Sequence, residues 1–182
     1  MSKIALTGNA SGTGVFTIAS PNTNTDRTLT LPDEAGTIDT LQRAGNVLQV
    51  VNVVYATVTS SSSSTYADTG LSANITPTSS SSKILVLVNQ GGCGKQTNNT
   101  RIRLKLLRGA TDIQTIDPGV GGFTNSTATN FIGSISLAYL DFPATTSSTT
   151  YKTQFASHNS SATVYVQTDG AASSITLMEI AA

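Results

Sequence analysis

The sequence predicts an all-β protein, with an N-terminal extended β-hairpin arm over residues 1–43 and a jelly-roll-like antiparallel β-sandwich over residues 47–182. Three observations lead to this prediction. Apolar and polar residues alternate with a period of two almost throughout, and no segment repeats convincingly at the helical period of 3.6. Clusters of Ser, Thr, Asn and Gly separate the alternating segments, as turns do. Hydrophobic residues make up 38% and charged residues 11%, which is unlike the composition of a disordered chain.

The sharpest alternation lies in residues 101–106. Its apolar and cationic residues fall on opposite faces of a strand, so one face is expected to pack into a core while the other meets water: Ile102, Leu104, Leu106 and Arg101, Arg103, Lys105. Further strands are expected at 47–59, 71–76, 83–90, 112–116, 131–142, 149–157, 162–168 and 174–180. The polar segments between them, including Gly91–Asn99, are expected to be loops. The number and spacing of these strands favour a two-sheet jelly roll.

Residues 1–43 contain few apolar residues, and these form two short segments, Val15–Ile18 and Thr28–Leu31, around a polar loop. An isolated hairpin of this size is marginal in water. We therefore expect neighbouring copies or a partner protein to cover its apolar side chains, which are Phe16, Ile18, Leu29 and Leu31. Residues 39–49 are interpreted as a connector, because Gly45 weakens any helix there.

The segment 12–38 resembles a module found near the N-termini of bacteriophage tail-fibre and related virion proteins. In that module an apolar strand, a polar Pro/Asn loop and the pattern T-L-T-L-P-D-x-x-G-T follow in this order. The positions that carry the resemblance are Leu29, Leu31, Pro32, Asp33, Gly36 and Thr37.

The C-terminal region resembles the last strands of a jelly-roll module found at the ends of phage fibres. That module has a D-x-P turn, a T-Y-K strand and a closing I-T-x-M-E-I strand. The matching positions here are Asp141, Pro143, Thr150, Tyr151, Lys152 and Ile175 to Ile180.

The two resemblances together imply a homotrimer, with the N-terminal arms wrapped about a threefold axis and the jelly rolls outward. They imply that the oligomer and attachment interface contains Phe16, Ile18, Leu29, Leu31, Pro32 and Gly36. The implied partners are other copies, other virion proteins of the tail, baseplate or capsid, and a host surface glycan. Such a protein is made in the host bacterial cytoplasm and acts in the virion.

Large fibres carry a long shaft between attachment module and tip, whereas here barely a connector separates the two modules. The leading expectation is therefore a short trimeric tail or baseplate fibre, or a fibre tip, that attaches to the host. The alternative is a capsid decoration protein, and a polysaccharide depolymerase is a third reading. The depolymerase would need two converging carboxylates. Asp33 and Glu34 are the one adjacent pair, and their side chains diverge in extended backbone, so we expect no enzyme activity.

No motif indicates a catalytic, cofactor or metal site. Gly91–Gln96 is similar to a phosphate-binding loop, but Asn89 and Gln96 stand where that loop needs a glycine and a Ser or Thr. Cys93 and His158 are the single cysteine and the single histidine, which excludes an internal disulfide and a Cys/His metal cluster. Both are expected to be structural or loop residues, and no cofactor is expected.

The cationic stripe of Arg101, Arg103 and Lys105 has two interpretations. It is either the solvated face of a strand or a contact with an anionic surface, and Tyr66 is the candidate stacking platform for a sugar. Nucleic acid is not an expected partner, because ten basic and ten acidic residues cancel and no aromatic residue interleaves with the stripe. Membrane insertion is not expected either, since no long apolar run occurs.

Overall fold

The computed structural model describes residues 11–15, 17, 19, 22–26, 28, 43–95, 100–116, 131–160 and 162–182. The chain divides into two compact units, Met1–Ile38 and Asp39–Ala182, so the second unit begins a few residues before the predicted end of the arm at residue 43. The six predicted interface positions of the arm lie outside the described residues: Phe16, Ile18, Leu29, Leu31, Pro32 and Gly36.

Within its described residues the second unit is all-β, which confirms the predicted fold class. Its regular elements are β1 Val47–Tyr55, β2 Thr59–Ser61, β3 Ala67–Ile75, β4 Lys83–Lys95, β5 Ile102–Arg108, β6 Thr111–Ile116, β7 Phe131–Asp141, β8 Thr149–Ser157, β9 Val164–Val166, the 3-10 turn η1 Thr168–Gly170 and β10 Ser173–Ile180.

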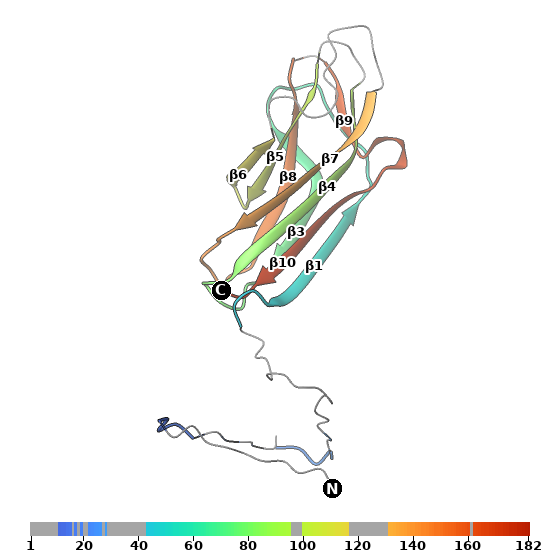
Figure 1. Ribbon diagram of the computed structural model, residues 1–182. Coiled ribbons are helices and arrows are strands. Elements are labelled where there is room, and N and C mark those ends of the chain that lie inside the picture. The colour runs from blue at the N-terminus through green and yellow to red at the C-terminus, as the bar shows by residue number, and fades with distance from the viewer. Residues whose placement is uncertain are drawn as a thin grey trace. The chain divides into compact units, whose positions relative to one another are not determined.

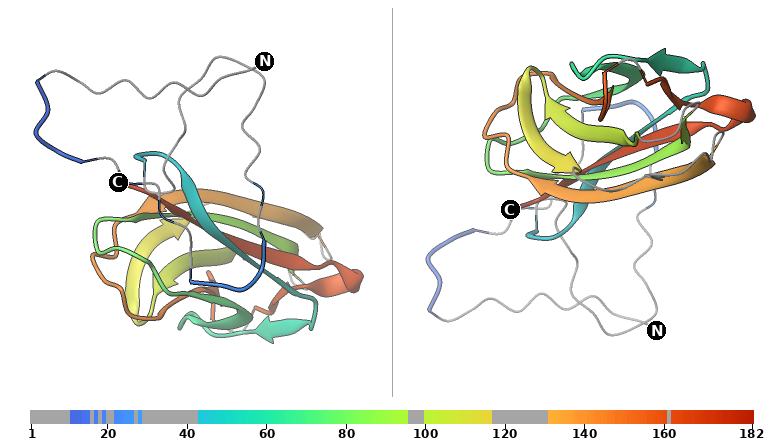
Figure 2. Two further views of the ribbon diagram at one scale, coloured as in Figure 1. Left: turned by 90° about the horizontal axis from the view of Figure 1, so that it is seen from below. Right: turned by 90° about the horizontal axis from the view of Figure 1, so that it is seen from above.

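The strands form two packed antiparallel sheets (Figures 1 and 2). Sheet A contains β1, β10, β4 and β7 in this order, and the short strands β9 and β2 extend it beside β4. Sheet B contains β3, β8, β5 and β6. The pairing is nested, because β1 pairs with β10, β3 with β8, β4 with β7 and β5 with β6. This nested order is that of a jelly roll, in which one long antiparallel ribbon is rolled into two sheets.

Alternate residues of the strands point between the sheets and form two apolar clusters. The cluster nearer the start of β1 includes Leu71, Ile84, Val86, Ile175 and Leu177. The other cluster lies toward the opposite end of the sandwich and contains Cys93, Ile102, Leu104, Ile135, Phe155, Val164 and Val166. The three apolar residues predicted for the inner face of the strand at 101–106 are at most 1% exposed, as their alternation predicted.

A buried chain of polar side chains crosses from one sheet to the other between these clusters. The Thr69 and Thr153 hydroxyls of sheet B are 2.6 Å apart, and Thr153 also donates to Gln90 Oε1 of sheet A over 2.9 Å. Gln90 Nε2 donates to Ser173 Oγ over 2.8 Å. All four side chains are almost fully buried, so each bond replaces one that water would otherwise make.

Several sequence-based boundaries were wrong, and β3, predicted to start at residue 71, begins at Ala67. Residues 91–95, predicted to be part of a flexible loop, continue β4 as a buried strand, and its pairing with β7 shifts register between Gln90 and Cys93. The predicted strand at 47–59 ends at Tyr55, and a separate short strand, β2, begins at Thr59. The predicted strand at 162–168 is shorter, because η1 follows β9 almost immediately.

The register shift in β4 depends on glycine at position 92. Gly92 has a φ of +58°, a backbone conformation that residues other than glycine rarely adopt. A Cβ atom there would also overlap the backbone nitrogen and oxygen of Thr168. The glycine cluster that had the composition of a loop therefore provides close backbone packing inside the sandwich.

Candidate functional site

The predicted cationic stripe lies on the outer face of sheet B, on an inner strand flanked by β8 and β6. Two of its side chains lie over the ring of Tyr66, which directly precedes β3. The Arg103 guanidinium is 5.0 Å and the Lys105 ammonium 4.4 Å from the ring centroid. Lys105 also pairs with Asp112 over 2.9 Å. The third predicted member, Arg101, precedes β5, and its carbonyl oxygen accepts a hydrogen bond from the His158 N–H.

This grouping, Tyr66 with Arg103 and Lys105, is named the Tyr66 platform. Two cations near one aromatic ring are attracted by its negative face and repelled by each other. Tyr66 is half-buried, and the cations already contact its ring, so the platform does not present an open ring on which a sugar could stack. Chemically, it suits an anionic group better than stacking of a neutral sugar.

The rest of the outer face of sheet B also carries charge, with both signs. Lys152 pairs with Asp68 over 2.9 Å, and Gln154 donates to the same carboxylate over 2.7 Å. These hydrogen bonds and the Lys152 charge outweigh partial burial and lower the pKa of Asp68 below its ordinary value. The face is therefore a solvated surface of mixed charge on which the Tyr66 platform is the concentration of cations.

Asp141, at the end of β7, joins three strands through its carboxylate. Arg108 Nη1 of β5 lies 2.9 Å from both carboxylate oxygens, and the Tyr151 hydroxyl of β8 donates to Oδ2 over 2.6 Å. Tyr151 is fully buried, and its burial beside the Asp141 carboxylate raises the pKa of the phenol well above its ordinary value of 10. Both Asp141 and Tyr151 belong to the C-terminal resemblance, and the geometry gives them a structural role.

Glu179 is a second buried carboxylate with hydrogen bonds on both oxygens. Gln49 Nε2 donates to Oε2 over 2.6 Å, while the Thr78 N–H and hydroxyl donate to Oε1 over 2.7 and 2.8 Å. Burial raises the pKa of Glu179, but these hydrogen bonds outweigh that effect and hold it below its ordinary value. Glu179 thus remains an acceptor that fixes the Thr78 turn beside β1 and β10.

Cys93, the single cysteine of the chain, is buried inside the sandwich on β4. Cys93 is 1% exposed, and its burial raises the thiol pKa to about 12, so thiolate is scarce at neutral pH. Its thiol donates to the Gln90 carbonyl over 3.2 Å. Over the described residues, no group of three or more His, Cys, Asp and Glu side chains could hold a metal ion.

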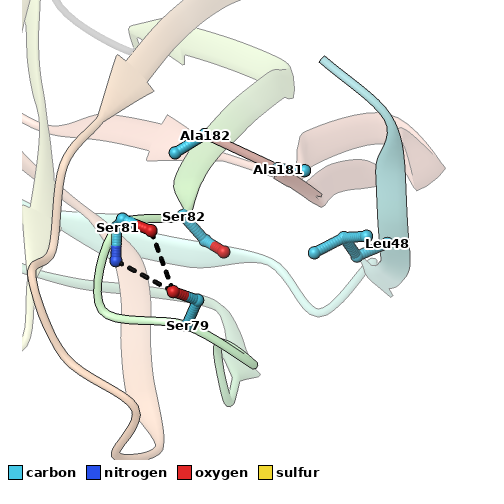
Figure 3. A pocket seen from close by; sticks show the side chains of 6 residues that line it. All are labelled: Leu48, Ser79, Ser81, Ser82, Ala181 and Ala182. Atoms are coloured by element: carbon cyan, nitrogen blue, oxygen red, sulfur yellow. Dashed lines mark hydrogen bonds between the residues drawn. The ribbon is translucent and has the colours of Figure 1, made fainter. Parts of the chain in front are cut away.

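Small hollows on the sandwich offer little chemistry. One is lined by Leu48, Ser79, Ser81, Ser82, Ala181 and Ala182, and Figure 3 shows the Ser79 hydroxyl bonded to Ser81 at its edge. A second is lined by Asp68, Gly70, Leu71, Ser72, Thr150 and Lys152. The first contains no ionisable side chain, and the charged groups of the second are paired with each other. In the part of the chain that the structure describes, no helix is long and apolar enough to cross a membrane.

The outer face of sheet A differs from that of sheet B, because apolar side chains follow one another across its strands. Val50, Met178, Leu85 and Leu140 are cross-strand neighbours on β1, β10, β4 and β7. This set is named the apolar row. The residues between them along each strand point into the core, so the members of the row point outward. Sequence reasoning missed this surface, although five consecutive apolar residues at 84–88 are typical of a strand covered on both faces.

A scan against protein-family models and a search of curated proteins gave no match to this chain.

Proposed function

We propose that this chain is a structural protein of a bacteriophage virion without enzyme activity, and that it forms a short homotrimeric tail or baseplate fibre, or a fibre tip, that attaches to the host. The observation that carries the proposal is the contrast between the two outer faces of the jelly roll. Sheet B presents paired charges and the Tyr66 platform to water, whereas sheet A presents the apolar row. A sandwich with one solvated and one apolar outer face suits a subunit that is covered on one side.

The resemblances at 12–38 and at the C-terminus supply the identification with phage fibres and the trimer. The jelly roll agrees with the module that the C-terminal resemblance implies. In the proposed assembly the arm attaches the trimer to other virion proteins, with Phe16, Ile18, Leu29, Leu31, Pro32 and Gly36 as the candidate contacts. The Tyr66 platform and Arg101 then face outward as the candidate contact with an anionic host glycan.

The carboxylates of the strands support a role without catalysis. Asp68, Asp112 and Asp141 each form an ion pair with a cation of sheet B, and Glu179 is held by Gln49 and Thr78. A glycosidase needs two carboxylates that face one substrate groove. Residues engaged in separate pairs on separate strands are poorly placed for that chemistry.

A capsid decoration protein is the second candidate, and the short connector favours it. The second unit begins at Asp39 and β1 begins at Val47, so little chain separates the arm from the jelly roll. A subunit that docks on a capsid surface needs no shaft, whereas a fibre gains reach from one. The same arm would then bind capsomers.

Copy number and position in purified particles test the proposal. Quantitative mass spectrometry of intact particles, with gold-labelled antibody to locate the chain, separates the candidates. A few to a few tens of copies at the tail support the fibre, and binding of the purified chain to host cells supports attachment. Hundreds of copies on the capsid favour decoration, and absence from particles overturns both.

A further inference from the structure

The exposed apolar side chains of the second unit are concentrated on sheet A. Among the described residues of the second unit, the well-exposed large hydrophobic side chains lie on β1, β4 and β7 or close to their ends in the chain. Over the same residues, none lies on a strand of sheet B. Val50 is 56% exposed, Leu140 43% and Leu87 36%. Scattered single residues of this kind are normal on a protein surface, but neighbours on adjacent strands form a patch.

The strand register makes these residues neighbours across the sheet. The apolar row consists of Val50, Met178, Leu85 and Leu140. On one side it is flanked by Val47 and Ile180, which pair with each other. Phe142 lies on the same side, and the centroid of its ring is 5.7 Å from the Lys83 ammonium. The next row on the other side contains Asn52, Thr176, Leu87 and Ala138. Beyond it lie Val54, Ser174, Asn89 and Ser136.

Charge is nearly absent from this face. Of the outward positions in the four rows just described, Lys83 alone is charged, and the polar ones carry amides or hydroxyls. Sheet B, by contrast, carries Asp68, Arg103, Lys105, Asp112 and Lys152 on its outer side. An apolar region bordered by neutral polar residues and depleted of charge is typical of the composition of a protein–protein interface.

The face is also large enough to matter for association. Four strands at about 4.8 Å and four rows at about 6.8 Å give a surface of roughly 500 Å² before side-chain relief is counted. A standard interface buries about 800 Å² on each partner. The sheet face therefore supplies most of one interface.

The position at which the chain enters the sandwich indicates that another copy of the chain covers this face. Residues 43–46 lead into β1 at the apolar end of sheet A, where Gly45 donates to the Ala181 carbonyl and Ala181 donates to the Asn46 carbonyl, both over 2.9 Å. The arm that precedes them is expected to pair with other copies, because a hairpin of the size that its sequence predicts is marginal in water on its own. Copies joined by their arms bring this end of each sheet A together at high effective concentration. The equal numbers of basic and acidic residues leave no net charge to oppose the contact.

We propose that the outer face of β1, β10, β4 and β7 is the contact between jelly rolls of neighbouring copies, with the apolar row at its centre. The inference rests on the proposed function, since it assigns the subunit contact within the proposed trimer. It leaves sheet B, with the Tyr66 platform, on the outside of the assembly. In this assembly the arm and the sheet face both contribute to association.

A matched pair of double variants of the full chain tests the assignment. Leu85→Asp with Leu140→Asp places two carboxylates in the proposed contact, while Ser72→Asp with Asn74→Asp adds the same charge to the exposed outer side of β3. Light scattering over a concentration series should show at least about a 100-fold rise in the dissociation constant for the first variant and little change for the second. A first variant that associates as tightly as the native chain would overturn the inference.

A labelling experiment keeps the test independent of folding defects. Cys93 is buried, so a thiol introduced by Ala138→Cys or Ser72→Cys is modified selectively by a maleimide. We expect at least about tenfold slower labelling at position 138 in the assembled protein than in dilute protein, and equal rates at position 72. Equal rates at both positions in assembled protein would show that another surface is buried. That result would remove the face assignment and leave the proposed function standing, whereas absence of the chain from particles would remove the function whichever face is buried.

Discussion

Tyr151→Phe is expected to destabilise the sandwich by about 2 kcal/mol, since a hydrogen bond to a charged group contributes about 1.5–3 kcal/mol. The Tyr151 hydroxyl donates over 2.6 Å to Asp141, whose side chain is 6% exposed, so water cannot easily replace it. Arg108 would still pair with the carboxylate, which keeps the cost below that of stranding a buried charge. At about 2–4 °C per kcal/mol, the melting temperature should fall by roughly 4–8 °C.

Thermal and urea unfolding, followed by circular dichroism, measure this loss. Tyr139→Phe is the matched control, because Tyr139 packs against the same core and donates none of the bonds in the Asp141 cluster. We expect the control to change stability by less than about 0.5 kcal/mol. If Tyr151→Phe cost no more than the control, Asp141 would not be the link between β7 and β8 that the geometry indicates.

Three further predictions concern the buried polar chain, the bulge in β4 and the carboxylate of β10. Thr153→Val removes the donor to Gln90 Oε1 and should cost about 1–3 kcal/mol in urea unfolding, with an unchanged m-value if the fold is retained. Gly92→Ala should destabilise more than Gly109→Ala, because both glycines have φ near +60° but only the former Cβ meets backbone, and equal losses would contradict the close packing at Gly92. Glu179, whose pKa is lowered in the folded protein, contributes stability that is present above its ordinary pKa of 4.5 and is lost as pH falls through the folded value. Glu179→Gln should therefore lower stability at pH 7 and flatten its decline in acid, and an unchanged pH profile would count against the role of Glu179.

The sequence predicts the strands well, because every second residue is apolar in a strand that has one buried face. The alternation of Ile102, Leu104 and Leu106 with cations is reproduced by their burial in the structure. The prediction of a loop at 91–95 was wrong because the segment is rich in glycine, and glycine has no side chain from which alternation could be read. Such a composition occurs both in loops and in bulged, buried strands.

The groupings of side chains lay beyond the sequence. Tyr66 meets Arg103 and Lys105 because β8 pairs with both β3 and β5, and this order depends on strands far apart in the chain. Asp141, Arg108 and Tyr151 likewise come from three strands. The apolar row had a signal in the unbroken apolar run at 84–88, but its continuity across β1, β10 and β7 required the register.

The oligomeric mass of the purified full chain shows whether the protein assembles as a structural subunit. Sedimentation equilibrium or light scattering over a range of concentrations should give three times the mass of one chain, with dissociation in the Leu85→Asp and Leu140→Asp double variant. A native chain that remains at the mass of one copy throughout the range would contradict the proposed trimer.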